Sequence, residues 1–173
     1  EAEGSEDASL ADSVNRFKTA AYTIERPLHL GAAVAGASDQ LIAAFRGYGH
    51  DIGIAFQLRD DLLGVFGDPA VTGKPAGDDL REGKRTVLLS LALQRADESD
   101  PAAAAELRRL IGQTEDPQEI ARMAEIIEAS GAPDVVEQRI SDLTRSGLAH
   151  LHDAPVSPEV TTTLEELARK STA

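Results

Sequence analysis

The sequence predicts an all-α protein, on two observations of composition and one of pattern. Its 173 residues are 42% hydrophobic but only 3% aromatic, with one Met and no Trp. Ala, Leu and Ile therefore carry most of the apolar surface, and they suit closely packed helices better than a β-sandwich or barrel. Apolar residues also recur at three- and four-residue spacing. We expect a single helical domain over residues 1–173.

The first helices are expected on both sides of Pro27. Residues 9–22 have a helical pattern, in which Ser9 is a candidate cap and Leu10, Val14 and Phe17 share a face. Pro27 either kinks a longer helix or opens the next one, because a proline is tolerated in the first turn. Residues 27–36 continue with small and apolar side chains suited to tight helix contact.

A long helix is predicted from Ser38 or Asp39 to about Phe66, with Gly67 as its stop. This helix contains glycines at positions 47, 49 and 53. Each lowers helix propensity by about 1 kcal/mol relative to alanine. We therefore expect another element to pack against bare backbone at these positions.

Residues 67–83 are rich in Gly, Pro and Asp and predict a long ordered loop. The helix expected over residues 84–96 is apolar on most of its circumference, which indicates burial. Four amphipathic surface helices should follow, each opened by an acidic residue or serine with proline at its first position. They are expected over residues 100–113, 116–131, 132–154 and 157–171.

Charge and composition exclude several classes of function. A formal net charge of −13 opposes binding to nucleic acid. The absence of cysteine excludes disulfides, thiolate zinc sites and thiol catalysis. The sequence has no run of about 18 apolar residues and no signal-peptide pattern, so we expect a cytoplasmic protein without stable membrane insertion.

Two adjacent carboxylates, Asp60 and Asp61, interrupt the apolar end of the long helix. Gln57, Asp60 and Gly64 share one helix face, and Asp61 lies on the same side. Neighbouring carboxylates in a partly buried place repel each other and lose hydration, so cations must be near. One interpretation is an ordinary ion pair with Arg59; the other is a Mg²⁺ site, since this ion prefers oxygen ligands and is completed by substrate phosphates.

Three lysines favour the second interpretation. Lys74 and Lys84 each follow a glycine in the predicted loop, which allows close approach to a ligand. Lys18 lies on an apolar helical face and is followed by Thr19, although a lysine there could simply extend its ammonium to solvent. Metal-holding carboxylates, lysines and an apolar helical cavity suit the ionisation of an allylic diphosphate, whose departing group they would stabilise.

The region from Lys18 to Thr86 resembles the C-terminal half of a trans-isoprenyl diphosphate synthase, the polyprenyl synthetase family that includes geranylgeranyl diphosphate synthases. Three motifs carry the resemblance, in the family's order. They are the Lys-Thr helix "KTAAYTIERPLHLGAAVAG", the second aspartate-rich motif "GIAFQLRDDLLG" and the loop "GKPAGDDLREGKRT". Residues 10–95 carry the strong part of the match, and the remaining residues match only as generic helices.

The resemblance implies an isoprenoid synthase-type helical bundle around a central cavity, of which this chain is the C-terminal portion. It also implies a homodimer and head-to-tail addition of isopentenyl diphosphate to an allylic diphosphate. By position, Asp60 and Asp61 match metal ligands, and Asp79 matches an acid that organises the loop near the metals. The residues that match the substrate-binding set are Lys18, Thr19, Gln57, Lys74 and Lys84. The catalytic candidates are Lys18, Asp60, Lys74 and Lys84.

The sequence departs from the family at three places, one of which is Leu88, where many members carry proline at a helix start. The third acid of the second motif is replaced by Gly64, which puts one metal ligand in question. The first aspartate-rich motif is absent, so we expect a fragment of a longer enzyme, or a half that pairs with the missing N-terminal half, inactive alone. A non-catalytic subunit or truncated homologue and a terpene cyclase-like protein are the alternatives. The four histidines share no metal-ligand spacing and are expected in packing or surface roles.

Overall fold

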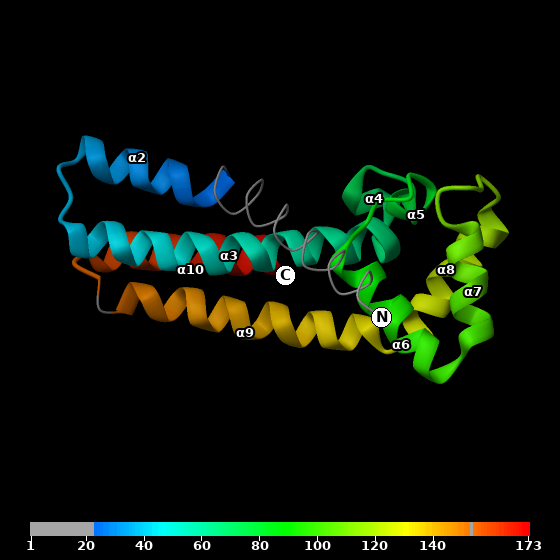
Figure 1. Cartoon of the computed structure of the whole chain (residues 1–173). Coiled ribbons are helices and arrows are strands. Elements are labelled where there is room, and N and C mark those ends of the chain that lie inside the picture. Colours follow the sequence, from blue (N-terminus) through cyan, green and yellow to red (C-terminus); the bar gives the residue numbers. More distant parts are fainter. Residues whose placement is uncertain (1–22, 153) are drawn as a thin grey trace. The chain divides into compact units, whose positions relative to one another are not determined.

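The computed structural model describes residues 23–152 and 154–173, which form helices without any strand (Figure 1). The helix expected over residues 9–22 lies outside this range. The chain divides into two compact units. We call one of them the bundle unit; its described residues are 23–59 and 138–173. We call the other the loop unit; its described residues are Asp60–Glu137. Helices α3 (Asp39–Phe66) and α9 (Ala132–His152) each contribute to both units.

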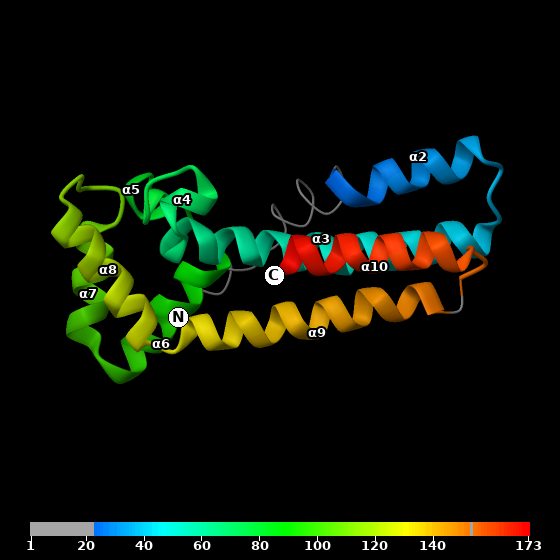
Figure 2. The same cartoon turned by 180° about the vertical axis from the view of Figure 1, so that it is seen from behind.

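The bundle unit packs α2 (Arg26–Val34) and α10 (Pro158–Thr172) with its parts of α3 and α9. Figure 2 shows α10 lying along α3. The two are joined by hydrogen bonds from the Tyr48 hydroxyl to the Leu164 carbonyl (2.8 Å) and from Arg59 Nε to the Thr172 carbonyl (3.1 Å). All four helices contribute to one buried apolar cluster, formed by Ala32, Phe45, Tyr48, Ile52, Leu151, Leu164 and Ala168.

Neighbouring elements pack against Gly47 and Gly49 of α3, as predicted for these two positions. A Cβ at Gly47 would lie 2.6 Å from the His150 ring, and one at Gly49 would lie 2.8 Å from the Glu25 backbone. Any side chain at these positions would displace its neighbour, so the glycines permit close approach at the expense of helix propensity. The boundaries predicted for this helix are also confirmed, since α3 runs from Asp39 to Phe66.

Pro27 is the second residue of α2 and is preceded by a wide π-type turn over residues 23–25. The residue before the helix, Glu25, already has helical dihedral angles (φ −63°, ψ −51°). The first N–H groups of a helix have no intrahelical partner, so the missing N–H of a proline in the first turn costs no hydrogen bond. The backbone can therefore be helical both before and after Pro27.

The buried Tyr48 phenol makes the bundle unit sensitive to alkali. Burial raises the pKa of Tyr48 to about 12, from its ordinary 10.0. A raised pKa means that the folded state holds the proton more tightly, so this stabilisation is present below pH 10 and is lost as the pH rises toward 12. Between pH 10 and pH 12, the free energy of unfolding of the wild type should fall by about 2–3 kcal/mol, as measured by denaturant titration. The Tyr48→Phe variant has no phenol to ionise and should not show this fall.

At pH 7 the Tyr48→Phe variant should be less stable than wild type by about 1 kcal/mol, because the hydrogen bond to Leu164 is gone. Parallel loss of stability by both proteins between pH 10 and 12 would contradict this assignment.

In the loop unit, α6 (Val87–Ser99), α7 (Pro101–Leu110) and α8 (Pro117–Ala129) pack on one another. The predicted burial of the helix after residue 84 is confirmed for the first half of α6, where Leu88, Leu89 and Ala92 are buried. Helices α7 and α8 each bury one stripe at three- and four-residue spacing, as the amphipathic pattern predicted. The buried residues of these stripes are Ala104, Leu107, Leu110, Ile120, Met123, Ile126 and Ile127.

Three of the predicted helix starts are confirmed by their capping bonds. Asp100, Asp116 and Ser157 each accept a hydrogen bond from a backbone N–H in the first turn of the helix they precede. The helix expected over residues 132–154 does begin at Ala132, but the predicted pattern of its start is wrong. Its proline, Pro133, is the second helical residue and not the first. Its Ala132 N–H is bound by the Ser130 hydroxyl instead (3.1 Å).

The predicted continuous loop over residues 67–83 is also wrong in part. It contains two one-turn helices, α4 (Pro69–Thr72) and α5 (Asp78–Arg81). A one-turn helix is too short for its apolar residues to repeat at helical spacing, so no periodic pattern in the sequence marks it. No helix in the described part of the chain is long and apolar enough to cross a membrane.

Candidate functional site

The two adjacent acids lie in the last two turns of α3, in the loop unit. They differ sharply in exposure: the Asp61 side chain is fully buried, whereas that of Asp60 is 53% exposed. Burial of an uncompensated carboxylate is costly, so Asp61 needs partners. Of the two acids, Asp60 alone has a side chain that is about half-exposed to solvent.

A Schellman motif at the end of α5 brings Asp79 and Lys84 together. The N–H of Lys84 binds the Asp79 carbonyl (2.9 Å), and the N–H of Gly83 binds the Leu80 carbonyl (3.3 Å). Gly83 has the left-handed conformation that this motif requires at its turn (φ +64°). The spacing of "DLREGK" thus sets Lys84 beside the acid five residues earlier.

The Lys84 ammonium lies among three carboxylates. Its Nζ donates to Asp79 Oδ2 at 2.8 Å and lies 3.5 Å from Asp60 Oδ2 and 3.7 Å from Asp61 Oδ1. These four side chains are called the Asp–Lys cluster below. One ammonium among three carboxylates leaves a formal charge of −2 (+1 and −3).

Two opposing effects act on Lys84. Burial lowers the pKa of its ammonium, but the hydrogen bond to Asp79 and the charges of Asp79, Asp61 and Asp60 outweigh burial and raise the pKa above its ordinary value. Lys84 is therefore cationic at neutral pH. It can hold the acids together and still present a positive charge to an anion, since its side chain is 36% exposed.

Gly64 allows Asp79 to reach α3. A Cβ built at position 64 would lie 2.9 Å from Asp79 Oδ1, and closer still to Asp79 Cγ and Oδ2. The carboxylate of Asp79, itself 7% exposed, thus fills the space where a side chain at position 64 would begin. Sequence reasoning missed this contact, because helix periodicity carries no information about which distant side chain approaches a glycine.

The other predicted site residues are placed differently. Lys74 is exposed and, among the described residues, its ammonium makes no ion pair. It lines a pocket of about 640 Å³ with Arg81 and residues of α8, among them Ile120. Gln57 is half-buried on α3, in the bundle unit. Lys18 and Thr19 lie outside the described residues.

The first interpretation of the acids, an ordinary ion pair with Arg59, stays a prediction. Arg59 lies in the bundle unit, where its Nε is bound to the Thr172 carbonyl. Within the loop unit, the Lys84 ammonium lies 3.5 Å from Asp60 Oδ2.

The donor chemistry of the cluster fits Mg²⁺. All three acids offer hard oxygen ligands, and their formal excess of negative charge favours a divalent cation. Within the described ranges, no group of three or more His, Cys, Asp or Glu residues is placed so that it could hold a metal ion. Mg²⁺ does not need such a group, because it keeps several waters and commonly uses one or two carboxylates plus substrate phosphates.

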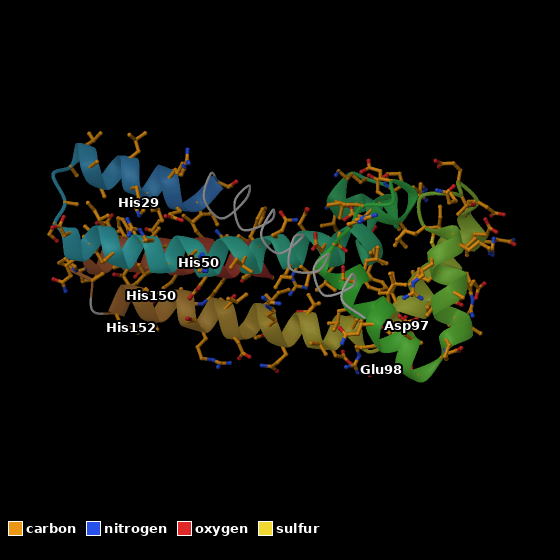
Figure 3. The ribbon with its side chains drawn as sticks, in the orientation of Figure 1. His29, His50, Asp97, Glu98, His150 and His152 are labelled. Carbon is orange, nitrogen blue, oxygen red and sulfur yellow. The ribbon has the colours of Figure 1, made fainter. Side chains whose placement is uncertain are left out.

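The four histidines belong to the bundle unit. Figure 3 shows His29, His50, His150 and His152 on three helices, α2, α3 and α9. In the bundle unit, His29 Nδ1 lies 3.8 Å from Glu25 Oε1, and His150 Nε2 lies 3.5 Å from Asp51 Oδ2. These contacts agree with the predicted packing and surface roles.

Comparisons with known proteins agree with the motif resemblance. Residues 7–129 match the family model "Polyprenyl synthetase". A geranylfarnesyl diphosphate synthase of Aeropyrum pernix is 43% identical over 135 residues, which cover 77% of this chain and 40% of the relative. A geranylgeranyl diphosphate synthase of Mycobacterium tuberculosis is 35% identical over 141 residues, covering 82% of this chain and 40% of the relative.

Solved structures show the same relationship. A putative geranylgeranyl pyrophosphate synthase of Corynebacterium glutamicum has a TM-score of 0.94 and 67% identity, over 96% of this chain and 50% of that one. A second structure of the enzyme from that organism, complexed with isoprenyl diphosphate and magnesium, also has a TM-score of 0.94. The chain spans about half the length of the relatives it matches. The predicted all-α isoprenoid synthase fold is confirmed, and the chain belongs to the polyprenyl synthetase family.

Proposed function

We propose that the protein is a prenyltransferase that condenses isopentenyl diphosphate with an allylic diphosphate, and that this chain supplies a wall of its diphosphate site. The observation that carries the proposal is the Asp–Lys cluster. A cation that is both anchored by acids and partly exposed is suited to bind a phosphate oxygen. The named activities of the relatives support the same reaction class.

Each residue of the cluster has a distinct part in the proposal. Asp60, half-exposed, is the principal magnesium ligand, and Asp61 supports the metal from its buried position beside it. Lys84 binds the diphosphate and stabilises the charge that develops as the allylic carbon–oxygen bond breaks. Mg²⁺, when bound, would add further stabilisation of that leaving group.

The remaining predicted residues complete the substrate site in this proposal. Lys18, Thr19, Gln57 and Lys74 are proposed to bind the diphosphate from other parts of the chain, in the roles that the family resemblance implies. A homodimer and a cytoplasmic location are proposed on the same resemblance. These assignments add to the cluster but do not carry the proposal.

Calorimetry with farnesyl diphosphate and with inorganic pyrophosphate tests the diphosphate site directly. Both ligands should bind the chain in the presence of MgCl₂ and lose most of their affinity in EDTA. Farnesol, which has the same hydrocarbon and no diphosphate, is the matched control and should bind far more weakly. Equal binding of farnesol and farnesyl diphosphate would exclude the Asp–Lys cluster as the determinant.

The reaction itself is tested with labelled isopentenyl diphosphate and farnesyl diphosphate, using the chain together with any residues encoded upstream of Glu1. The expected product is a linear prenyl diphosphate lengthened by five-carbon units. A cyclic hydrocarbon would instead support the terpene cyclase alternative.

A further inference from the structure

A tight turn follows α7 in the loop unit. Its two central residues, Ile111 (φ −59°, ψ 124°) and Gly112 (φ +66°), have the dihedral angles of a type II β-turn. The N–H of Gln113 donates to the Leu110 carbonyl (2.9 Å) and closes the turn. A type II turn requires a positive φ at its third residue, which favours glycine there. None of the three motifs that carry the family resemblance contains this turn.

Gly112 of this turn contacts Gly83, the residue before Lys84. A Cβ built on Gly112 would lie 3.1 Å from the Gly83 Cα, and one built on Gly83 would lie 3.1 Å from the Gly112 Cα. The atoms in contact belong to the backbone, so they cannot rotate away as the end of a side chain can. A side chain at Gly112 would therefore push the two segments apart by a few tenths of an ångström.

A hydrogen bond joins the same two segments. The Gly112 N–H donates to the Leu80 carbonyl at 2.9 Å, and the Gly83 N–H donates to the same carbonyl at 3.3 Å. A carbonyl oxygen has two lone pairs and can accept both bonds. The shorter bond comes from Gly112, so the end of α5 is held by the turn after α7 as well as by its own chain.

The position of the Lys84 ammonium depends on where this contact places Gly83. Lys84 follows Gly83 directly, its N–H binds the Asp79 carbonyl (2.9 Å), and its ammonium binds Asp79 Oδ2 (2.8 Å). A displacement of Gly83 therefore moves the start of the Lys84 side chain relative to Asp79. An ammonium that has lost its fixed place stabilises a phosphate oxygen less well, because such stabilisation depends on preorganised geometry.

We propose that Gly112 is a positioning residue for diphosphate binding, which acts through Gly83 on the Lys84 ammonium. The turn after α7 sets the direction in which the chain leaves α5, and thereby where the ammonium lies. The part that concerns the diphosphate rests on the proposed function; the coupling of Gly112 to Lys84 does not.

The first test measures binding of inorganic pyrophosphate by the full chain in MgCl₂, using calorimetry. Gly112→Ala should weaken binding by about tenfold, the scale on which loss of a supporting residue weakens a site. Gly131→Ala is the matched control, because Gly131 lies in the same unit and also has a positive φ (+70°). The nearest atom to its Cβ is the flexible end of the Arg95 side chain, at 3.2 Å. Its affinity should stay within about twofold of wild type.

The second test asks whether Gly112 acts through Lys84, which a merely structural role would not require. In a chain that already carries Lys84→Met, Gly112→Ala should change the pyrophosphate affinity by less than about twofold, because the group that it displaces is gone. A general loss of structure would instead weaken binding equally with and without the Lys84 ammonium.

Thermal unfolding tests the same coupling without a ligand. Lys84→Met should lower Tm by about 5–10 °C in the wild-type chain, and by about 2–4 °C less when Gly112→Ala is present, because the ammonium is then already displaced from Asp79. Gly112→Ala and Gly131→Ala should each lower Tm by about 2–5 °C, because alanine is strained at positive φ. If Gly112→Ala does not fold, Gly112→Asn serves instead, since asparagine tolerates this conformation and adds the same Cβ.

Equal effects of Gly112→Ala with and without the Lys84 ammonium would overturn the inference, and so would a Gly112→Ala chain with wild-type pyrophosphate affinity. Coupled Tm losses in a chain whose wild type binds no pyrophosphate would reject the proposed function and uphold the coupling of Gly112 to Lys84. Pyrophosphate binding by wild type, with independent effects of the two substitutions, would reject the inference and leave the proposed function standing.

Discussion

Replacing Lys84 with methionine is expected to lower the free energy of unfolding by about 2–3 kcal/mol at pH 7. The substitution keeps the bulk of the side chain and removes the ammonium that serves Asp60, Asp61 and Asp79. Breaking a fully buried pair costs about 3–5 kcal/mol, and the 36% exposure of Lys84 moves the expected loss below that range. Denaturant titrations followed by circular dichroism at 222 nm measure it.

Lys170→Met is the matched control, because it makes the same chemical change on the exposed side of α10. It should change stability by no more than about 0.5 kcal/mol. Equal stability of the two variants would contradict a structural role for the Lys84 ammonium.

The pH dependence of the Lys84 contribution follows from the sign of its shift. The pKa of Lys84 is raised in the folded state, so its contribution is fully present below the ordinary lysine pKa of 10.5. It is lost as the pH rises through the higher folded-state value. The stability difference between wild type and Lys84→Met should therefore be constant from about pH 7 to 9 and shrink above about pH 10.5.

The second large effect is expected on turnover. Asp60→Asn should reduce the rate of prenyl transfer by about 10²–10³-fold, the usual scale for removing one electrostatic contact to a transition state. The free energy of unfolding of this variant should change by less than about 1 kcal/mol, because the Asp60 side chain is 53% exposed. The assay again uses the chain together with any residues encoded upstream of Glu1. Its initial rates with isopentenyl and farnesyl diphosphates, over a range of MgCl₂ concentrations, separate weakened metal binding from slower chemistry.

Two comparison variants sharpen this prediction. Asp39→Asn makes the same change at the exposed start of the same helix and should keep wild-type turnover. Asp61→Asn should lose stability as well as activity, because the Asp61 side chain is fully buried near Lys84. If Asp60→Asn turns over at the wild-type rate at every magnesium concentration, the role proposed for Asp60 is contradicted.

Local sequence signals were enough wherever a structural decision is local. Asp39 and Gly67 delimit α3 as predicted, and the caps at Asp100, Asp116 and Ser157 follow from residue type and spacing alone. The one-turn helices α4 and α5 escaped prediction because four residues are too few to show a period. The Schellman turn that sets Lys84 beside Asp79 was not predicted, because the glycine before the lysine in "DLREGK" was interpreted only as allowing close approach to a ligand.

The sequence by itself determined the helical class, the long helix that carries Asp60 and Asp61, and the motif order that identifies the family. These depend on composition, periodicity and residue type, which act over a few neighbouring positions. Only the tertiary structure decided that Asp61 is buried, that Lys84 rather than Lys74 contacts the acids, and that Asp79 lies against Gly64. The physical reason is that each of these depends on the packing of α5 and the Lys84 turn against α3, and contacts between distant segments leave no periodic signal in the chain.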